Sequence, residues 1–351
     1  MYHLRQRRFV SDLGTLTYPL NYPAVRYLTY ESANQIWLTV STDNGNSWSN
    51  DTLIGNGKHP SLAASNGSAM VVWLNLDGTY PRIHSRFATP QTAPSTIPAV
   101  YLNAVEVVPV GLGYQPTNTA HPVVCYLGSS RGYITVYEAT PDGIVGGTSD
   151  NPFLVASRYS YVPGVKSGNA YAWQNPVQVP QSGVQGSNVS LHPSADYSWT
   201  PSSEGNGEMK LVWQRYVEGN PPVTPIGTAA NLLAPLQYIG LSASTESISD
   251  VEFWPIAPVS IQPDGRTKRY YRPCIVTDPT NSEKIIAWHA LDSASNSAVV
   301  MVKSIPANNS TTSPPSAFGQ YSNWFSPSLT FATDGSVSLW MERGSLAVMQ
   351  V

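Results

Sequence analysis

A short pattern recurs five times along this chain of 351 residues: a proline in an apolar segment, a turn, and a strand-like run that ends in an aromatic residue. The aromatic residue follows the proline by thirteen to twenty positions, and successive prolines lie between fifty and eighty positions apart. Self-similarity of this kind is typical of folds built from repeated supersecondary units. The five units start at Pro60, Pro122, Pro193, Pro273 and Pro327, and their aromatic residues are Trp73, Tyr137, Trp213, Trp288 and Trp340.

Two further strand-like runs follow each start, so that a unit contains four short strands. After Trp73, for example, these runs cover residues 82–87 and 100–108. Four short strands in a repeating unit of this length are typical of a β-propeller blade. The composition agrees, because 30 Pro and 26 Gly interrupt the chain too often for a helical protein. Proline at a repeat start suits the first residue of a strand, where a ladder hydrogen bond is dispensable.

A sixth unit lies upstream of the five, and the last unit is one strand short. Residues 24–30, 35–41 and 48–54 read as three strands of the first unit. The N-terminal run, residues 2–10, is predicted to supply the missing strand, because pairing of the N- and C-terminal strands closes the ring and removes its sheet edges. We therefore predict an all-β fold, a single six-bladed β-propeller domain (residues 1–351) with four antiparallel strands per blade. The predicted blades cover residues 11–56, 57–119, 120–190, 191–270, 271–324 and 325–351, the last together with the N-terminal strand 2–10.

An octet of turn residues, Ser-Thr-Asp-Asn-Gly-Asn-Ser-Trp, follows the strand-like run 36–40. Asp43 is expected to accept hydrogen bonds from backbone N–H groups of its own turn. Gly45 supplies the positive φ that a tight hairpin needs. Ser41 is expected to brace the end of the strand, and Trp48 to bury its ring between neighbouring blades.

The octet resembles the Asp box, Ser-x-Asp-x-Gly-x-x-Trp, and the chain is similar to sialidase-like (BNR/Asp-box) β-propellers. As architecture, the resemblance covers nearly the whole chain. As a specific motif it rests on this one full Asp box, whereas catalytic members of the family usually carry several. Asp boxes are generally remote from the catalytic centre in the families that carry them. The resemblance therefore implies a fold and a structural role for Ser41, Asp43, Gly45 and Trp48, and it does not imply a reaction.

The resemblance also implies what a sialidase site would contain: three arginines that bind the substrate carboxylate, a tyrosine paired with a glutamate, and an acid/base aspartate. In the family the first arginine sits in a Phe/Tyr-Arg-Ile-Pro string near the N-terminus. The nearest string here is Tyr80-Pro81-Arg82-Ile83-His84, which lies late in the second unit and has another order. An arginine clamp and two carboxylates are the minimum for this chemistry. Because this set cannot be placed in the sequence, no catalytic residue is assigned.

The residue before the repeat-start proline is the candidate for ligand binding. It is His59, His121 and His192 in three successive units, and then Arg272. Because the innermost strands of a propeller line its central channel, these positions are expected to form an arc at one depth. Such an arc suits an anion or a sugar; the alternatives are that the imidazoles brace neighbouring loops or bind a metal. Histidines related by ring symmetry are expected to lie too far apart to reach one ion at about 2.1 Å, so we predict no metal and no cofactor.

Several function classes are excluded by charge and motif content. The net charge of −3 leaves no basic field for nucleic acid. No apolar run reaches the roughly 18 residues of a membrane span, so no membrane insertion is expected. Phosphate loops, dinucleotide-binding glycines, nucleophile elbows and Cys-x-x-Cys metal strings are absent from the sequence.

These observations predict a non-catalytic binding or scaffold module that recognises a glycan or a protein at the mouth of the channel. We expect it to be secreted or on a cell surface, attached to other domains or subunits of a larger surface protein. The export signal is absent from this chain, since Met1–Arg5 does not begin a signal peptide. The alternatives are a diverged exo-sialidase or other glycoside hydrolase, and a purely structural assembly subunit.

Overall fold

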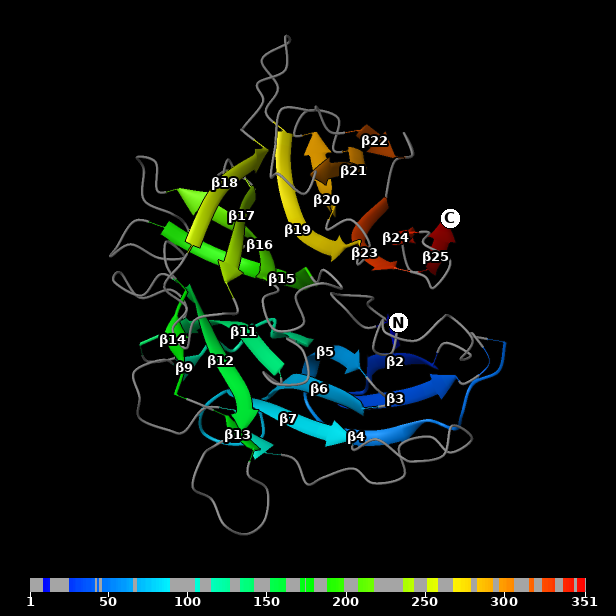
Figure 1. Ribbon diagram of the computed structural model, residues 1–351, viewed down its shortest axis with the longest axis vertical. Coiled ribbons are helices and arrows are strands. Elements are labelled where there is room, and N and C mark those ends of the chain that lie inside the picture. Colours follow the sequence, from blue (N-terminus) through cyan, green and yellow to red (C-terminus); the bar gives the residue numbers. More distant parts are fainter. Residues whose placement is uncertain are drawn as a thin grey trace.

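A computed structural model shows an all-β protein, which confirms the all-β part of the predicted fold (Figure 1). None of the described residues is helical, so the described part of the chain offers no helix that could cross a membrane. The structure describes residues 9–12, 25–41, 43, 46–65, 68–88, 105–107, 115–126, 133–141, 152–161, 171–173, 175–179, 188–198, 208–217, 236–242, 251–257, 268–278, 283–292, 297–305, 316–318, 324–331, 337–343 and 346–350.

The described strands form antiparallel sheets that follow one another along the chain and around the molecule (Figure 1). The first sheet contains β1 (Phe9–Asp12), β2 (Val25–Ser32), β3 (Gln35–Ser41) and β4 (Thr52–Asn56). The second contains β5 (Lys58–Ser65), β6 (Ser68–Asn75), β7 (Arg82–Ala88) and β8 (Val105–Glu106). The third contains β10 (Val123–Tyr126), β11 (Tyr133–Thr140), β12 (Phe153–Tyr161) and β13 (Tyr171–Trp173), with β9 (Gln115–Pro116) paired to β11 and β14 (Val177–Gln178) paired to β12.

The second half of the chain repeats this arrangement. The fourth sheet contains β15 (Asn188–Ser198), β16 (Glu208–Val217), β17 (Leu236–Ser242) and β18 (Val251–Ala257). The fifth contains β19 (Lys268–Thr277), β20 (Lys284–Asp292), β21 (Ser297–Ile305) and β22 (Ser316–Phe318). The last described sheet contains β23 (Trp324–Phe331), β24 (Val337–Arg343) and β25 (Leu346–Gln350).

The first strand of each sheet lies next to the first strand of the following sheet. These neighbours are β1 and β5, β5 and β10, β10 and β15, β15 and β19, and β19 and β23, and β23 in turn lies near β1. Buried side chains fill the space between successive sheets; one cluster, for example, joins Val123 and Ile134 of the third sheet to Leu211 and Trp213 of the fourth. The hydrophobic core is therefore divided among the interfaces between sheets.

The N-terminal strand is placed differently from the sequence prediction. Phe9 and Val10 pair with Leu28 and Tyr27 of β2, so β1 is the first strand of the first sheet. The prediction that the N-terminal strand belongs to the last blade was therefore wrong for Phe9 and Val10. The first sheet would otherwise lack its inner strand, which explains the pairing. Residues 2–8 of the predicted strand lie outside the described residues, and among the described strands no pairing joins β1 to β25.

The repeat-start prolines lie at interruptions of the strand ladder. In four sheets the pairing register shifts at the X-Pro dipeptide, between Lys58 and Ser61 and at the corresponding points of β15, β19 and β23. The prediction that proline is the first residue of its strand was wrong for these four. A β-bulge leaves a residue unpaired, and proline has no N–H to donate there. Pro122, by contrast, precedes β10, which begins at Val123.

The serine after the proline links neighbouring inner strands. The backbone N–H of Val124 in β10 donates to Ser61 Oγ of β5 over 3.2 Å. The backbone N–H of Ile275 in β19 donates to Ser194 Oγ of β15 over 3.3 Å. Both serine side chains are buried, so each hydroxyl satisfies a backbone group that water cannot reach. This gives the His-Pro-Ser sequence a structural role in holding successive sheets together.

The turn at the octet is organised by Asp43. Its carboxylate accepts hydrogen bonds from Ser41 Oγ (2.8 Å), the Ser47 backbone N–H (2.8 Å) and Ser47 Oγ (2.5 Å). The predicted roles of Ser41 and Asp43 agree with these contacts, and Gly45 lies outside the described residues. Trp48 does not have its predicted place, because 39% of the residue is exposed. The hydrogen bonds fix the turn through Asp43 and do not require the indole ring to be buried.

These hydrogen bonds predict how the turn responds to acid. Donation from the Ser47 hydroxyl and backbone and from the Ser41 hydroxyl lowers the pKa of Asp43 from 3.8 to about 2. Because the folded pKa is depressed, the stabilisation is complete above the unfolded value and is lost as pH falls toward 2. We expect Asp43→Asn to lose less thermal stability than the wild type between pH 5 and pH 2. The control is Asp51→Asn at an exposed neighbouring position; equal losses in wild type and Asp43→Asn would contradict this role for Asp43.

Candidate functional site

Three histidines that precede repeat-start prolines lie in contact with one another. His59 is in β5, His121 lies two residues before β10, and His192 is in β15. The ring centroids of His59 and His121 are 4.2 Å apart, and those of His121 and His192 are 4.3 Å apart. The structure therefore brings together the three predicted histidines, which we call the histidine cluster. Adjacent inner strands direct these side chains toward one another.

The backbone of the cluster is held in an uncommon conformation. His59 has a φ of 54° and His192 a φ of 52°, both in the left-handed region. Non-glycine residues adopt this region rarely, at a cost of about 1–3 kcal/mol, and a residue before proline normally favours extended backbone. Both residues lie in the bulges described above. The bulges thus place the imidazoles of His59 and His192, from the second and fourth sheets, on either side of His121.

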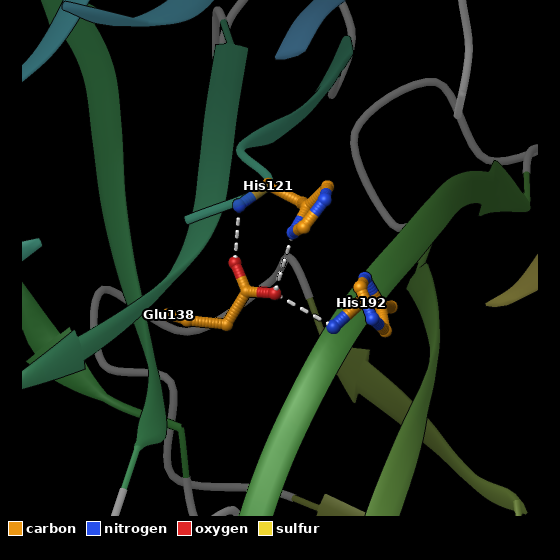
Figure 2. A group of neighbouring side chains, drawn as sticks. All are labelled: His121, Glu138 and His192. Carbon is orange, nitrogen blue, oxygen red and sulfur yellow. Dashed lines mark hydrogen bonds and ion pairs between the residues drawn. The ribbon is translucent and has the colours of Figure 1, made fainter. Parts of the chain in front are cut away.

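A buried glutamate, which sequence reasoning did not identify, lies between two of the histidines (Figure 2). Glu138 is in β11, where every side chain is buried. Its Oε2 accepts a hydrogen bond from the His121 backbone N–H over 2.5 Å, and its Oε1 accepts one from the His192 backbone N–H over 2.7 Å. His121 Nδ1 lies 3.3 Å from Glu138 Oε1. One carboxylate therefore joins the third sheet to the fourth.

Burial also determines the charge of this glutamate. Burial raises the pKa of Glu138 from 4.5 to about 6, against the opposing effect of nearby His192 and of the two backbone N–H donors. The carboxylate is therefore mostly ionised at neutral pH, and the two N–H donors offset part of the cost of burying its negative charge. The sequence signal for this site was Glu138 itself, a charged residue in an otherwise apolar strand. A glutamate is seldom fully buried without partners, so such a residue indicates a polar contact.

A second glutamate repeats the arrangement at the interface between the first and second sheets. The backbone N–H of His59 donates to Glu31 Oε2 over 3.0 Å. Glu31 lies near the end of β2, the second strand of its sheet, as Glu138 lies in the second strand of the third sheet. Glu31 is half-buried whereas Glu138 is fully buried. A carboxylate from one sheet thus fixes the histidine of the next sheet at two interfaces.

Arg272, the fourth predicted ligand-binding residue, occupies the bulge of β19 that corresponds to the bulge of His192. The structure describes its place in the strand but not its side chain. Arg272 therefore stays a prediction, whereas the geometry of His59, His121 and His192 is defined.

The cluster offers polar groups with limited exposure. His121 is buried, with 7% of the residue exposed, and His59 and His192 are half-buried. A partly buried imidazole donates or accepts hydrogen bonds in an environment of reduced dielectric constant, which suits recognition of hydroxyl or anionic groups. Both oxygens of Glu138 accept hydrogen bonds from the backbone N–H groups of His121 and His192, so this carboxylate positions the histidines. His121, Glu138 and His192 could also hold a metal ion, since one ligand atom from each lies within 4.8 Å of the others.

Comparison with known proteins reveals similarity of fold only. No protein-family model and no curated protein matches the chain. AofleA from Arthrobotrys oligospora matches with 9% identity over 99% of this chain and 82% of that chain, with a TM-score of 0.51. A neuraminidase-like protein of A/little yellow-shouldered bat/Guatemala matches with 8% identity over 99% and 95%, with a TM-score of 0.50. An endo-arabinase from Bacteroides thetaiotaomicron has 13% identity over 99% and 93%, with a TM-score of 0.46. The chain accordingly has an all-β fold similar to the β-propeller folds of these solved structures.

Proposed function

We propose that this chain is a non-catalytic, six-bladed β-propeller module that binds a glycan through the histidine cluster, outside the cell and as part of a larger surface protein. The observation that carries the proposal is the convergence of His59, His121 and His192 from three successive sheets. Strained backbone at two of these residues supports a functional site, because such strain concentrates where ligands bind.

The six-bladed ring is supported by the order of neighbouring inner strands. Each first strand lies beside the next, and β23 lies near β1. Six successive sheets in the described residues fit one blade each. A closed ring places the residues before the repeat-start prolines around one central channel. Arg272 then extends the cluster by one blade.

The non-catalytic assignment is supported by the position of Glu138. A glycoside hydrolase needs a carboxyl group that reaches the scissile bond and a second carboxylate on the other side of the sugar. Glu138 is completely buried, and each of its oxygens accepts a backbone N–H. The neuraminidase-like neighbour, through its name, supports a sugar as the ligand class. A fluorogenic sialoside that is turned over by the purified chain would contradict the assignment.

A glycan array that includes neutral and sialylated sugars tests the proposal. We expect wild type to bind a defined subset and His121→Ala/His192→Asn to lose at least about 10-fold in affinity, as expected when polar contacts of about 1.4 kcal/mol or more are lost. Asparagine is chosen at His192 because it tolerates the left-handed backbone. His84→Gln, on the third strand of the second sheet, is the matched histidine control. Unchanged binding in the double variant would contradict the proposal. It would favour a packing role for the histidine cluster and a structural role for the chain.

A further inference from the structure

Two imidazoles and a carboxylate lie together at the interface between the third and fourth sheets. Glu138 is in β11 of the third sheet, His121 lies just before β10 of the same sheet, and His192 comes from β15 of the fourth (Figure 2). One ligand atom from each residue lies within 4.8 Å of the others. We propose that His121, Glu138 and His192 form a binding site for a divalent transition-metal ion of the zinc class.

The donor chemistry selects the class of ion. Two imidazole nitrogens and one carboxylate oxygen are a ligand set that suits Zn²⁺ and the neighbouring first-row ions. Ca²⁺ and Mg²⁺ prefer sites built from oxygen ligands, so two histidines disfavour them. The carboxylate also supplies a negative charge for the cation.

The geometry needs little adjustment. Ligands of a tetrahedral ion at about 2.1 Å lie roughly 3.4 Å apart. His121 Nδ1 and Glu138 Oε1 are already 3.3 Å apart. The remaining separations, at most 4.8 Å, close by side-chain rotation of His192, which is half-buried. Three protein ligands leave one coordination position for water or a bound group.

Surrounding contacts fix the ligands in advance. The backbone N–H groups of His121 and His192 hold the two oxygens of Glu138, and each oxygen keeps a second lone pair for an ion. The ring of His59 packs against His121 and restricts its orientation. Hydrogen-bonded carboxylates and packed imidazoles of this kind are what metal sites use to orient their ligands.

The metal site goes beyond the proposed glycan binding and is tested without a glycan. Untagged, chelator-treated protein is titrated with Co²⁺, whose visible absorption reports coordination, and then with Zn²⁺ in competition. We expect one equivalent of Co²⁺ to give the intense visible bands of tetrahedral coordination and Zn²⁺ to abolish them. Isothermal titration calorimetry with Zn²⁺ gives the affinity. Absence of the bands and of Zn²⁺ binding in the wild type would overturn the proposal, whatever the glycan array shows.

Two matched variants test the ligand set. His192→Asn removes a proposed ligand, and His59→Asn removes a histidine with nearly the same φ in the equivalent bulge. We expect His192→Asn to weaken Zn²⁺ binding by at least the roughly 10–100-fold that losing a supporting residue costs, and His59→Asn to weaken it less. Equal binding by the wild type and His192→Asn, with both proteins folded by circular dichroism, would remove His192 from the site and overturn the proposal.

Discussion

Trp73→Ala is expected to lower the free energy of unfolding by about 3–5 kcal/mol, the usual cost of removing a large buried aromatic side chain. Trp73 is 1% exposed in β6 and packs in the cluster that joins the first two sheets. Its Nε1–H donates to the backbone oxygen of Asn56 over 2.8 Å. A Cβ added at Gly55 would lie 2.6 Å from the indole, so the strand of the first sheet approaches the ring as closely as glycine allows. Alanine would therefore leave a cavity in the interface between the first and second sheets.

The measurement is urea unfolding followed by fluorescence and by far-ultraviolet circular dichroism, with coincident transitions as the test of cooperativity. Trp48→Ala is the matched control, because Trp48 is 39% exposed and its removal is expected to cost less than about 1 kcal/mol. Trp73→Phe should fall between the two, since it keeps a ring and loses the N–H. An effect of Trp73→Ala no larger than that of Trp48→Ala would contradict the assigned packing.

The all-β fold could be predicted from the repeat because burial of an aromatic side chain recurs from unit to unit. Trp73, Trp213 and Trp288, which end the predicted strands, are almost completely buried in the structure. The proline before each run marked the inner strand correctly, and so placed His59 and His192 on the first strands of the second and fourth sheets. The periodicity is visible in the sequence because the second to fifth sheets each bury an aromatic side chain at the same place in the repeat.

Only part of the candidate site could be predicted from the sequence. The sequence identified the histidines but not the bulges that give His59 and His192 positive φ, since a register shift depends on pairing with another strand. Glu138 was missed because it belongs to the second strand of its unit and breaks no repeat. The predicted burial of Trp48 was wrong. The motif specifies the hydrogen bonds within its own turn, which centre on Asp43, but it does not specify which residues pack over the turn.

Glu138→Ala is expected to destabilise the chain by about 2–4 kcal/mol. The substitution leaves two backbone N–H groups, those of His121 and His192, without the carboxylate that accepts them. Each buried donor left unsatisfied costs about 1–3 kcal/mol, and removing the buried carboxylate offsets part of the sum, since burial itself disfavours the charged form. The loss should appear in chelator-containing buffer, where no metal contributes.

Glu31→Ala is the matched control for this substitution. Glu31 is half-buried and accepts one backbone N–H, from His59, so its loss is expected to cost about 1 kcal/mol. Glu138→Gln should lie between Glu138→Ala and the wild type, because an amide accepts one of the two N–H groups and directs its own NH₂ toward the other. If Glu138→Ala cost no more than Glu31→Ala, the carboxylate would not be the group that joins the third sheet to the fourth. The expected order follows from the number of backbone donors that each glutamate satisfies and from how completely water is kept away from them.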